Sequence, residues 1–281
     1  MITDAGALSV EQRACVNSWL GEVRVIADHS WGQTDTVVIE VESQAARFIV
    51  KAGGEKNGHI AREIRAHRRW TGPWVSKGHA ARLIGADEAA RVLVTTYLPG
   101  ILVEGSSAQQ DPDMYRQAGT RLADFHSQQQ VFDLQWNDNL RKRVLRFLDM
   151  PHRIASETVK RVRSELAGWP TGGAMTVPTH GDWQPRNWLN DGGVLRVIDL
   201  GRFDFRVPEE DFVRLGRQDF LSDPALEAAF LDGYGSDPRD RGMWRRMNVA
   251  EAVGTAAWAF MVGDQAFEAV GHSHLARLYT A

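Results

Sequence analysis

The sequence predicts an α+β fold in which a small antiparallel β-sheet with one key helix precedes a larger, mainly helical region. Between residues 23 and 97, short runs rich in Val, Ile and Thr alternate with turn residues. The Pro99-Gly100 pair then breaks the last of these strands. From Asp111 onward, apolar residues recur mostly at helical spacing. We therefore expect two lobes, formed by residues 1–97 and 98–281.

The predicted elements of the first lobe follow from local patterns. Ser9 and Gln12 form a capping box that begins a helix, and Gly21 ends this helix. The pattern then predicts strands over residues 23–27, 36–41, 47–51, 81–85 and 91–97. A helix over residues 59–70, with Ile60 and Ile64 on one face, separates the third strand from the fourth.

The rest of the chain is predicted to be mainly helical. Asp111 and Pro112 supply an N-cap and a proline at the first position of a helix. Further amphipathic helices are expected over residues 139–150, 155–168, 224–234, 239–261 and 265–279.

Composition limits the possible classes of function. Of the 281 residues, 43% are apolar and 25% are charged, which is enough for a large core. The net charge of −3 argues against nucleic acid as the main partner. No apolar run is long enough to span a membrane, and residues 1–20 do not resemble a secretion signal, so we expect a cytoplasmic protein. The single Cys15 is interpreted as a buried structural thiol.

The most informative stretch runs from Thr179 to Phe203 and reads THGDWQPRNWLNDGGVLRVIDLGRF. His180, Asp182 and Asn187 have the His-x-Asp-x-x-x-x-Asn spacing of a kinase catalytic loop. In such a loop the Asp accepts a hydroxyl proton and the Asn holds magnesium. The alternative is a polar loop that joins two core strands.

A hairpin in this stretch would complete a metal site. If Gly192-Gly193 is a two-residue turn, Asp191 faces Val194 and Asn187 lies across from Ile198. Asp199 then lies beside Asn187, although twelve positions separate them. Carboxylate and amide oxygens are hard ligands of the kind that Mg²⁺ prefers. Asn187 and Asp199 are therefore the predicted metal ligands, and Asp182 is the predicted catalytic residue.

The segments HGDWQPRNW and VIDLGR resemble the aminoglycoside phosphotransferase and choline kinase superfamily, and the antibiotic kinases in particular. The resemblance is strong over residues 178–213 and weak over the rest of the chain. It implies a bilobal protein-kinase-like fold, ATP (or GTP) as co-substrate, and Mg²⁺ as cofactor. It also implies that a small-molecule hydroxyl accepts the phosphoryl group.

Lys51 and Glu63 are candidates for binding the nucleotide. Arg47 to Lys51 resembles the kinase strand that ends in a phosphate-binding lysine, and Glu63 lies in the helix that follows. A glutamate at that place can pair with Lys51 and fix its direction. Alternatively, Lys51 is a surface lysine at the end of a strand, and Glu63 pairs with cations on its own helix.

The resemblance suggests three further nucleotide contacts. The loop over residues 28–35 would cover the phosphates, with Ser30 as its best side-chain donor. This loop lacks the repeated glycines of GxGxxG, so a plain hairpin loop is the alternative. Tyr97 and Leu98 would offer backbone groups to adenine, unless they are packing residues at the end of a strand. Arg186 either contacts a phosphate or pairs with a neighbouring acid.

Charge suggests the kind of acceptor. Residues 199–281 contain 9 Lys+Arg and 14 Asp+Glu, and in the superfamily this region lines the acceptor pocket. An acidic pocket would attract a polycation, such as an aminoglycoside or a basic cyclic peptide of the capreomycin–viomycin kind, and phosphorylation would give antibiotic resistance. A solvated acidic surface is the alternative explanation.

Other functions remain to be compared with this one. A kinase for choline, a sugar or an amino alcohol would use the same chemistry, and a pseudokinase would bind nucleotide without turnover. A eukaryotic-type protein kinase is disfavoured, because only eight positions separate Asp199 from Val207, too few for an activation loop.

Overall fold

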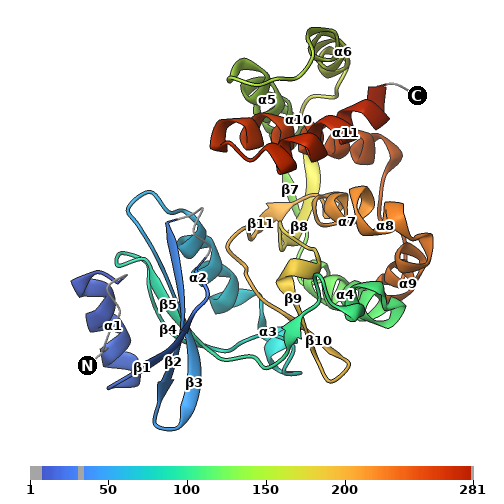
Figure 1. Ribbon diagram of the computed structural model, residues 1–281. Coiled ribbons are helices and arrows are strands. Elements are labelled where there is room, and N and C mark those ends of the chain that lie inside the picture. The colour runs from blue at the N-terminus through green and yellow to red at the C-terminus, as the bar shows by residue number, and fades with distance from the viewer. Residues whose placement is uncertain (1–7, 31–34, 280–281) are drawn as a thin grey trace. The chain divides into compact units, whose positions relative to one another are not determined.

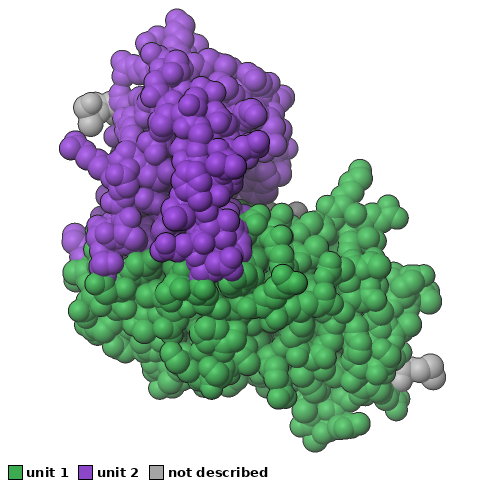
Figure 2. Space-filling model, turned by 180° about the vertical axis from the view of Figure 1, so that it is seen from behind, with its two compact units in different colours: residues 1–128, 180–204, 225–235 green, residues 129–179, 205–224, 236–281 purple. Residues whose placement is uncertain are grey.

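The computed structural model describes residues 8–30 and 35–279, and Figure 1 shows its helices and strands. The chain forms two compact units, which Figure 2 colours separately. The first unit comprises residues 1–128, 180–204 and 225–235, and the second comprises residues 129–179, 205–224 and 236–281. The predicted lobe boundary near residue 98 stays a prediction.

A five-stranded antiparallel sheet with the order β1-β2-β3-β5-β4 begins the first unit. Its strands are β1 (Arg24–Asp28), β2 (Thr36–Ser43), β3 (Ala46–Gly53), β4 (Leu83–Asp87) and β5 (Val92–Thr96). All five predicted strands are therefore present, and the expected α+β class is confirmed.

Helices bury the two faces of this sheet. Val50 of β3 belongs to the apolar core that includes α1 (Val10–Leu20), and the neighbouring Lys51 lies on the opposite face because side chains alternate along a strand. Leu93, the register partner of Lys51 in β5, packs with Ile60 and Ile64 of α2 (His59–Arg69). The end of β3 thus directs Lys51 towards the α2 side of the sheet.

The predicted capping of α1 is also present. The Ser9 hydroxyl accepts from the backbone N–H of Gln12, while the Gln12 side chain accepts from the Ser9 N–H, and Gly21 is the C-cap. Nε2 of Gln12 donates to the carbonyl oxygens of Gly53 at 3.1 Å and Ala90 at 2.9 Å. These bonds attach the first turn of α1 to the sheet.

The hairpin of the central stretch has the predicted register. Strand β9 (Trp188–Asp191) pairs with β10 (Val194–Val197), and Asp191 lies opposite Val194. Gly192 and Gly193 form the turn with φ of 58° and 90°, values that glycine adopts without steric cost. One step beyond the strands, the backbone N–H of Ile198 donates to the carbonyl of Asn187 at 3.0 Å.

Two helices of the first unit cross at close range. The first is α4 (Pro112–His126), whose N-cap Asp111 accepts from the N–H of Asp113 as its sequence predicts, and the second is α9 (Pro224–Tyr234). A Cβ atom added at Gly119 of α4 would overlap the carbonyl oxygen of Phe230, and one added at Gly233 would overlap that of Arg116. The absence of side chains at both glycines allows the contact.

Short elements and aromatic side chains complete the first unit. The short elements are α3 (Gly72–Val75), β6 (Ile101–Leu102), which pairs with β9, and the 3₁₀ turns η1 (Ser107–Gln110) and η2 (Pro185–Asn187). Six large, fully buried aromatic residues contact one another in a cluster that includes Trp183 of the loop over residues 180–187: Trp74, Tyr115, Phe125, Trp183, Trp188 and Phe203. The indoles of Trp183 and Trp188 lie 5.5 Å apart, so the loop has an apolar base.

The second unit is mainly helical, as its composition predicts. Its helices are α5 (Trp136–Asp149), α6 (Ser156–Ala167), α7 (Val213–Arg217), α8 (Asp219–Ser222), α10 (Arg241–Val262) and α11 (Gln265–Tyr279), and a 3₁₀ turn, η3 (Pro208–Asp211), precedes α7. A three-stranded sheet, β11-β8-β7, contains β7 (Val131–Asp133), β8 (Ala174–Thr179) and β11 (Asp204–Arg206). Over the described part of the chain, no helix is long and apolar enough to cross a membrane.

Candidate active site

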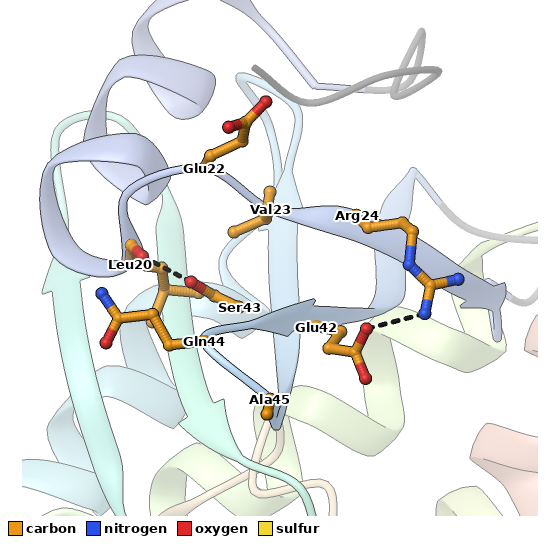
Figure 3. A pocket seen from close by; sticks show the side chains of 8 residues that line it. All are labelled: Leu20, Glu22, Val23, Arg24, Glu42, Ser43, Gln44 and Ala45. Atoms are coloured by element: carbon orange, nitrogen blue, oxygen red, sulfur yellow. Dashed lines mark hydrogen bonds and ion pairs between the residues drawn. The ribbon is translucent and has the colours of Figure 1, made fainter.

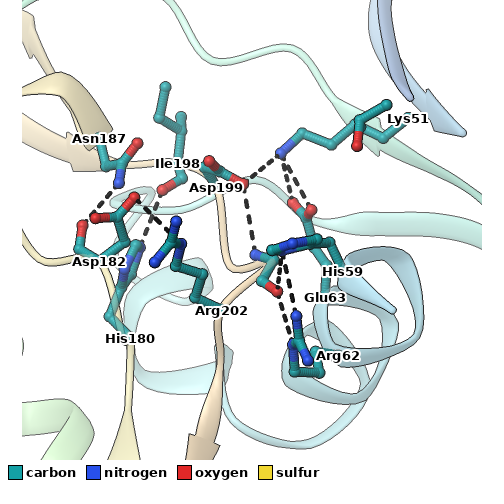
Figure 4. Close-up of polar contacts among 12 residues, drawn as sticks. Lys51, His59, Arg62, Glu63, His180, Asp182, Asn187, Ile198, Asp199 and Arg202 are labelled. Carbon is teal, nitrogen blue, oxygen red and sulfur yellow. Dashed lines mark hydrogen bonds and ion pairs between the residues drawn. The ribbon is translucent and has the colours of Figure 1, made fainter. Parts of the chain in front are cut away.

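The catalytic loop and the end of the hairpin bring three predicted residues together, and Figure 4 shows them. Asp182 and Asn187 lie in the loop, and Asp199 follows β10. Nδ2 of Asn187 donates to the backbone carbonyl of Asp182 at 2.7 Å, and the Asn187 carbonyl accepts from Ile198, the residue before Asp199. The register of the hairpin is therefore what places Asp199 near the loop.

His180 provides a second connection between the loop and the strand. Its side chain is fully buried, and its Nε2 lies 3.0 Å from the carbonyl oxygen of Ile198. An imidazole N–H that donates to this carbonyl holds the chain next to Asp199. His180 is thus a structural member of the His-x-Asp motif.

Lys51 lies between two carboxylates. Its Nζ is 2.8 Å from Oε1 of Glu63 and 3.2 Å from Oδ1 of Asp199, so the predicted pairing with Glu63 is present. Burial alone would lower the pKa of Lys51, but the charges of Asp199 and Glu63 outweigh it and raise that pKa above its ordinary value. The ammonium group therefore keeps its charge at any physiological pH.

The same cluster sets the charges of the two acids. The Lys51 cation holds the pKa of Asp199 well below its usual range, which keeps a half-exposed carboxylate ionised. Burial raises the pKa of Glu63, and the Lys51 cation opposes that rise. A hydrogen bond from the Leu200 backbone N–H also acts to lower the pKa of Glu63.

Asp199 has an unusual backbone. Its φ is 62°, in the left-handed region that residues with a Cβ rarely adopt. A conformation of this kind costs on the order of 1–3 kcal/mol and persists only where neighbouring groups hold it. Oδ1 of Asp199 accepts from the Gly201 N–H at 3.4 Å as well as from Lys51, so two donors hold the same carboxylate oxygen.

The Asp182 carboxylate is surrounded by donors. Gln184 donates through Nε2 to Oδ1, and Arg186 donates through Nη2 to Oδ2 at 2.6 Å. The Arg202 guanidinium lies 4.0 Å from Oδ2. Of the two alternatives for Arg186, the structure therefore contains the salt bridge, and its acid is the predicted catalytic residue itself.

The oxygen donors in the cluster suit a hard cation. In the described residues, neither Oδ1 of Asn187 nor Oδ2 of Asp199 has a hydrogen-bond partner, and Figure 4 shows the Asn187 oxygen turned away from Asp182. The same residues contain no group of three or more His, Cys, Asp or Glu side chains able to hold a metal. The donors present fit a magnesium ion that takes its remaining ligands from phosphate and water.

The three other predicted nucleotide residues lie along the sheet. Ser30 follows β1, and its hydroxyl accepts from the N–H of Val38, the register partner of Lys51 in β2. Tyr97 and Leu98 follow β5 and are partly buried, and the Tyr97 N–H donates to the Arg47 carbonyl at 3.1 Å. The backbone donor of Tyr97 is therefore engaged by the sheet, and Trp31 to Thr34 of the predicted loop lie outside the described residues.

Two groups of site residues were not predicted from the sequence. Gln184 and Arg202 approach Asp182, and His59 and Arg62 of α2 approach the carbonyl oxygen of Gly201. Arg202 belongs to the VIDLGR segment, so the motif contained a signal for it. His59 and Arg62 lie 142 and 139 positions from Gly201, and no local pattern connects them.

One hollow in the structure lies away from these residues. It has a volume of about 520 Å³ and is formed by the end of α1 and the turn between β2 and β3. Figure 3 shows its lining, which includes Glu22, Arg24 and Glu42, with Arg24 paired to Glu42 at 2.6 Å. It contains none of the predicted site residues, and it is open to solvent.

Comparison with known proteins gives one family match. The profile of a family described as "Phosphotransferase enzyme family" matches residues 27–248, which is more than half of the chain. No curated protein matches the sequence.

Solved structures of several phosphotransferases are similar to this chain. A thermostable mutant of aminoglycoside phosphotransferase APH(4)-Ia, in a ternary complex with ADP and hygromycin B, has a TM-score of 0.71 at 10% identity, covering 96% of this chain and 98% of that one. Choline kinase LicA from Streptococcus pneumoniae has a TM-score of 0.68 at 16% identity, with coverage of 95% and 98%. Macrolide 2'-phosphotransferase type I has a TM-score of 0.64 at 14% identity, also with coverage of 95% and 98%. At these identities the similarity shows the protein-kinase-like fold.

Proposed function

The chain belongs to the phosphotransferase enzyme family, and from this premise we propose that it moves the γ-phosphoryl group of ATP to a hydroxyl of a cationic small molecule. The observation that carries the proposal is the convergence of Asp182, Asn187 and Asp199 on one side of the Lys51–Glu63 ion pair. Phosphoryl transfer needs positioned charges more than covalent help from the protein, and this cluster supplies them.

Asp182 is the proposed catalytic residue. Its carboxylate orients the acceptor hydroxyl and takes its proton as the new O–P bond forms. The side chain is only 4% exposed, and Gln184 and Arg186 fix both of its oxygens. A carboxylate oxygen has more than one lone pair, so it can accept from the substrate while it keeps a protein partner.

Lys51, Asn187 and Asp199 are the proposed ligands of the triphosphate and its metal. Lys51 donates to phosphate oxygens, and the Glu63 carboxylate keeps the ammonium group directed towards them. Oδ1 of Asn187 and the carboxylate of Asp199 would hold Mg²⁺. When bound, this ion would neutralise charge on the phosphates.

The residues proposed to contact the rest of the nucleotide come shortly after strands β1 and β5. Ser30, one strand away from Lys51 through Val38, would donate to a phosphate. The main chain at Tyr97 and Leu98 would bind the adenine edge. In this proposal residues 1–97 form the nucleotide-binding lobe, and residues 98–281 form the lobe that holds the catalytic loop and the acceptor.

A cationic antibiotic is the proposed acceptor. The acidic excess over residues 199–281 supports it, and two similar structures contain hygromycin B and gentamicin according to their names. An aminoglycoside or a basic cyclic peptide of the capreomycin–viomycin type would fit such a region. The similarity to choline kinase LicA favours a second candidate, a kinase for choline or a related amino alcohol.

A direct assay separates these candidates. Purified protein is incubated with Mg·ATP and a panel of aminoglycosides, basic peptide antibiotics, macrolides, choline and sugars, and the products are weighed by mass spectrometry. We expect one added phosphoryl group on a cationic antibiotic, and Asp182→Asn serves as the inactive control. Transfer to choline alone would show that the acceptor is a metabolite and not an antibiotic. Nucleotide binding with no transfer to any acceptor would favour a pseudokinase.

A growth test checks the biological consequence. Bacteria expressing the wild-type chain should grow at higher concentrations of the phosphorylated antibiotic than bacteria expressing Asp182→Asn. Equal inhibition of the two strains would contradict a role in antibiotic resistance.

A further inference from the structure

Asp199 lies in a left-handed backbone conformation, and the turn that follows it is contacted by residues of α2. Aspartate adopts a φ of 62° more readily than most residues with a Cβ but still at some cost, so contacts of the surrounding groups favour it here. The side chain of Asp199 is held through Oδ1, by Lys51 at 3.2 Å and by the Gly201 N–H at 3.4 Å. The turn that follows Asp199 is held at the carbonyl of Gly201.

Arg62 is the defined donor to that carbonyl. Its Nε lies 2.9 Å from the Gly201 oxygen, and Nδ1 of His59 lies 3.0 Å from the same atom. Nδ1 of His59 also lies 3.3 Å from Nη2 of Arg62. A neutral imidazole nitrogen either donates or accepts, so Nδ1 can make only one of these two bonds. The guanidinium of Arg62 donates in either case.

Arg62 and Glu63 are neighbours in the chain, and they act on the two sides of Asp199. Glu63 binds Lys51, which binds the Asp199 side chain, while Arg62 binds the backbone of the turn. The turn is also tightly packed, because a Cβ added at Gly201 would lie 3.3 Å from Oδ1 of Asp199 and 3.3 Å from Cβ of His59. Two neighbouring residues of α2 therefore act on this region, Glu63 on the Asp199 side chain through Lys51 and Arg62 on the backbone of the turn.

We propose that Arg62 is a positioning residue for the metal–nucleotide complex, because it holds the Asp199 turn in the conformation in which the carboxylate faces the site. The inference rests on the proposed function, in which Asp199 is a metal ligand. Loss of Arg62 removes the charged donor from the Gly201 carbonyl and leaves it the contact with Nδ1 of His59, so the turn is held less firmly and Asp199 can relax towards an ordinary backbone conformation. The bound state must restore the strained conformation, so the metal-dependent part of nucleotide affinity falls.

Calorimetric binding of ADP tests the proposal without any turnover. The dissociation constant is measured with excess Mg²⁺ and with a chelator. The ratio of the two values gives the gain in ADP affinity that depends on the metal, called the metal-dependent gain below. We expect Arg62→Gln to reduce that gain by about tenfold, the typical size for a lost hydrogen bond from a charged donor, and to leave chelator affinity unchanged. Arg62→Lys, which keeps the charge and one donor, should lose less.

Arg68→Gln is the matched control. Arg68 lies on the same helix, is 46% exposed, and donates to Glu88 and to the carbonyl of Ala86 at 3.2 Å. It binds a carbonyl as Arg62 does, but one that lies away from Asp199. We expect the Arg68 variant to keep the wild-type gain.

Three other outcomes would contradict the proposed role of Arg62 or of the metal ligands. An Arg62→Gln variant with the same gain as Arg68→Gln overturns the proposal, and so does an equal loss of affinity with and without metal, which would indicate a purely structural role. If Arg62→Gln does not fold, Arg62→Lys carries the test with the same two readings. A wild-type protein that shows no metal-dependent gain would refute the metal assignment itself, and the inference with it.

Discussion

Nη2 of Arg186 lies 2.6 Å from Oδ2 of Asp182, the proposed proton acceptor. The arginine side chain is 39% exposed, whereas the aspartate side chain is 4% exposed. The pair therefore neutralises a nearly buried carboxylate with a cation that can still reach solvent. It also leaves the carboxylate with one fixed orientation, because Gln184 holds the other oxygen.

We expect Arg186→Gln to lower turnover by at least about tenfold, since misorientation of a catalytic group by a fraction of an ångström is costly. Affinity for Mg·ADP should change less than about twofold, because Arg186 contacts neither Lys51 nor Asp199. Steady-state kinetics and calorimetry on the same variant measure the two effects. The exposed Lys77, which pairs with Asp124, provides the control Lys77→Gln. Equal turnover in the two variants would show that Arg186 does not orient Asp182 for catalysis.

The hairpin turn offers a test of stability. Gly192 has a φ of 58° and no atom within 4 Å of an added Cβ, so a substitution there changes only the backbone energy. Gly192→Ala should lower the free energy of unfolding by about 1 kcal/mol, and Gly192→Asn should cost less, because Asn tolerates the left-handed region. Urea denaturation measures both values. An alanine variant as stable as the wild type would argue against the described turn.

Parts of the structure follow from local sequence. The turn residues Gly192 and Gly193 fix the register of the hairpin, and the register brings Asp199 to Asn187. The Ser9 capping box and the Asp111 N-cap likewise depend only on neighbouring residues, and both are present where predicted. Elements of this kind can be predicted because their cause lies within a few positions.

Other parts depend on tertiary contacts and have no local signal. The short strands β7 and β8 pair residues about 45 positions apart, such as Val131 with Thr176, and neither was predicted. The bond between Arg62 and Gly201 arises only when segments 139 positions apart fold together. The sequence therefore indicated the groups that we propose for the chemistry and the pairing of Lys51 with Glu63, but not the long-range contact of Arg62 with the Asp199 turn.

His67 of α2 should contribute to the pH dependence of stability. Burial lowers the pKa of His67 to about 3, and its side chain is only 6% exposed. In the unfolded chain the histidine binds a proton below a pH of about 6.5, whereas in the folded chain it does not, so stability falls as pH falls through this window. The loss from one such group approaches about 1.4 kcal/mol per pH unit.

The variant His67→Gln should therefore have a flatter profile of unfolding free energy between about pH 6.5 and pH 5, above the range in which ordinary carboxylates titrate. Denaturant titrations at a series of pH values supply the comparison. A His67 variant with the wild-type slope would mean that the folded chain protonates this residue normally.

The close approach of α4 and α9 predicts a large effect at a small residue. A methyl group at Gly119 would overlap the Phe230 carbonyl, so Gly119→Ala must push the helices apart or distort them. We expect a loss of stability of roughly 1–3 kcal/mol, as for other overpacked sites. Gly72→Ala is the control, because a Cβ at Gly72 meets no atom within 4 Å. Melting temperatures that are equal for the two variants would contradict the described packing.

The central claim is that Asp182 takes part in the chemical step while Lys51, Asn187 and Asp199 bind the metal–nucleotide complex. The most direct measurement compares Asp182→Asn with the wild type, both in phosphoryl transfer to the acceptor found in the mass-spectrometric panel and in calorimetric binding of Mg·ADP. The account predicts that turnover falls by roughly 10²–10⁴-fold, the range for loss of a general base, while the dissociation constant changes less than about twofold. Retained turnover, or an equal loss of turnover and binding, would contradict it.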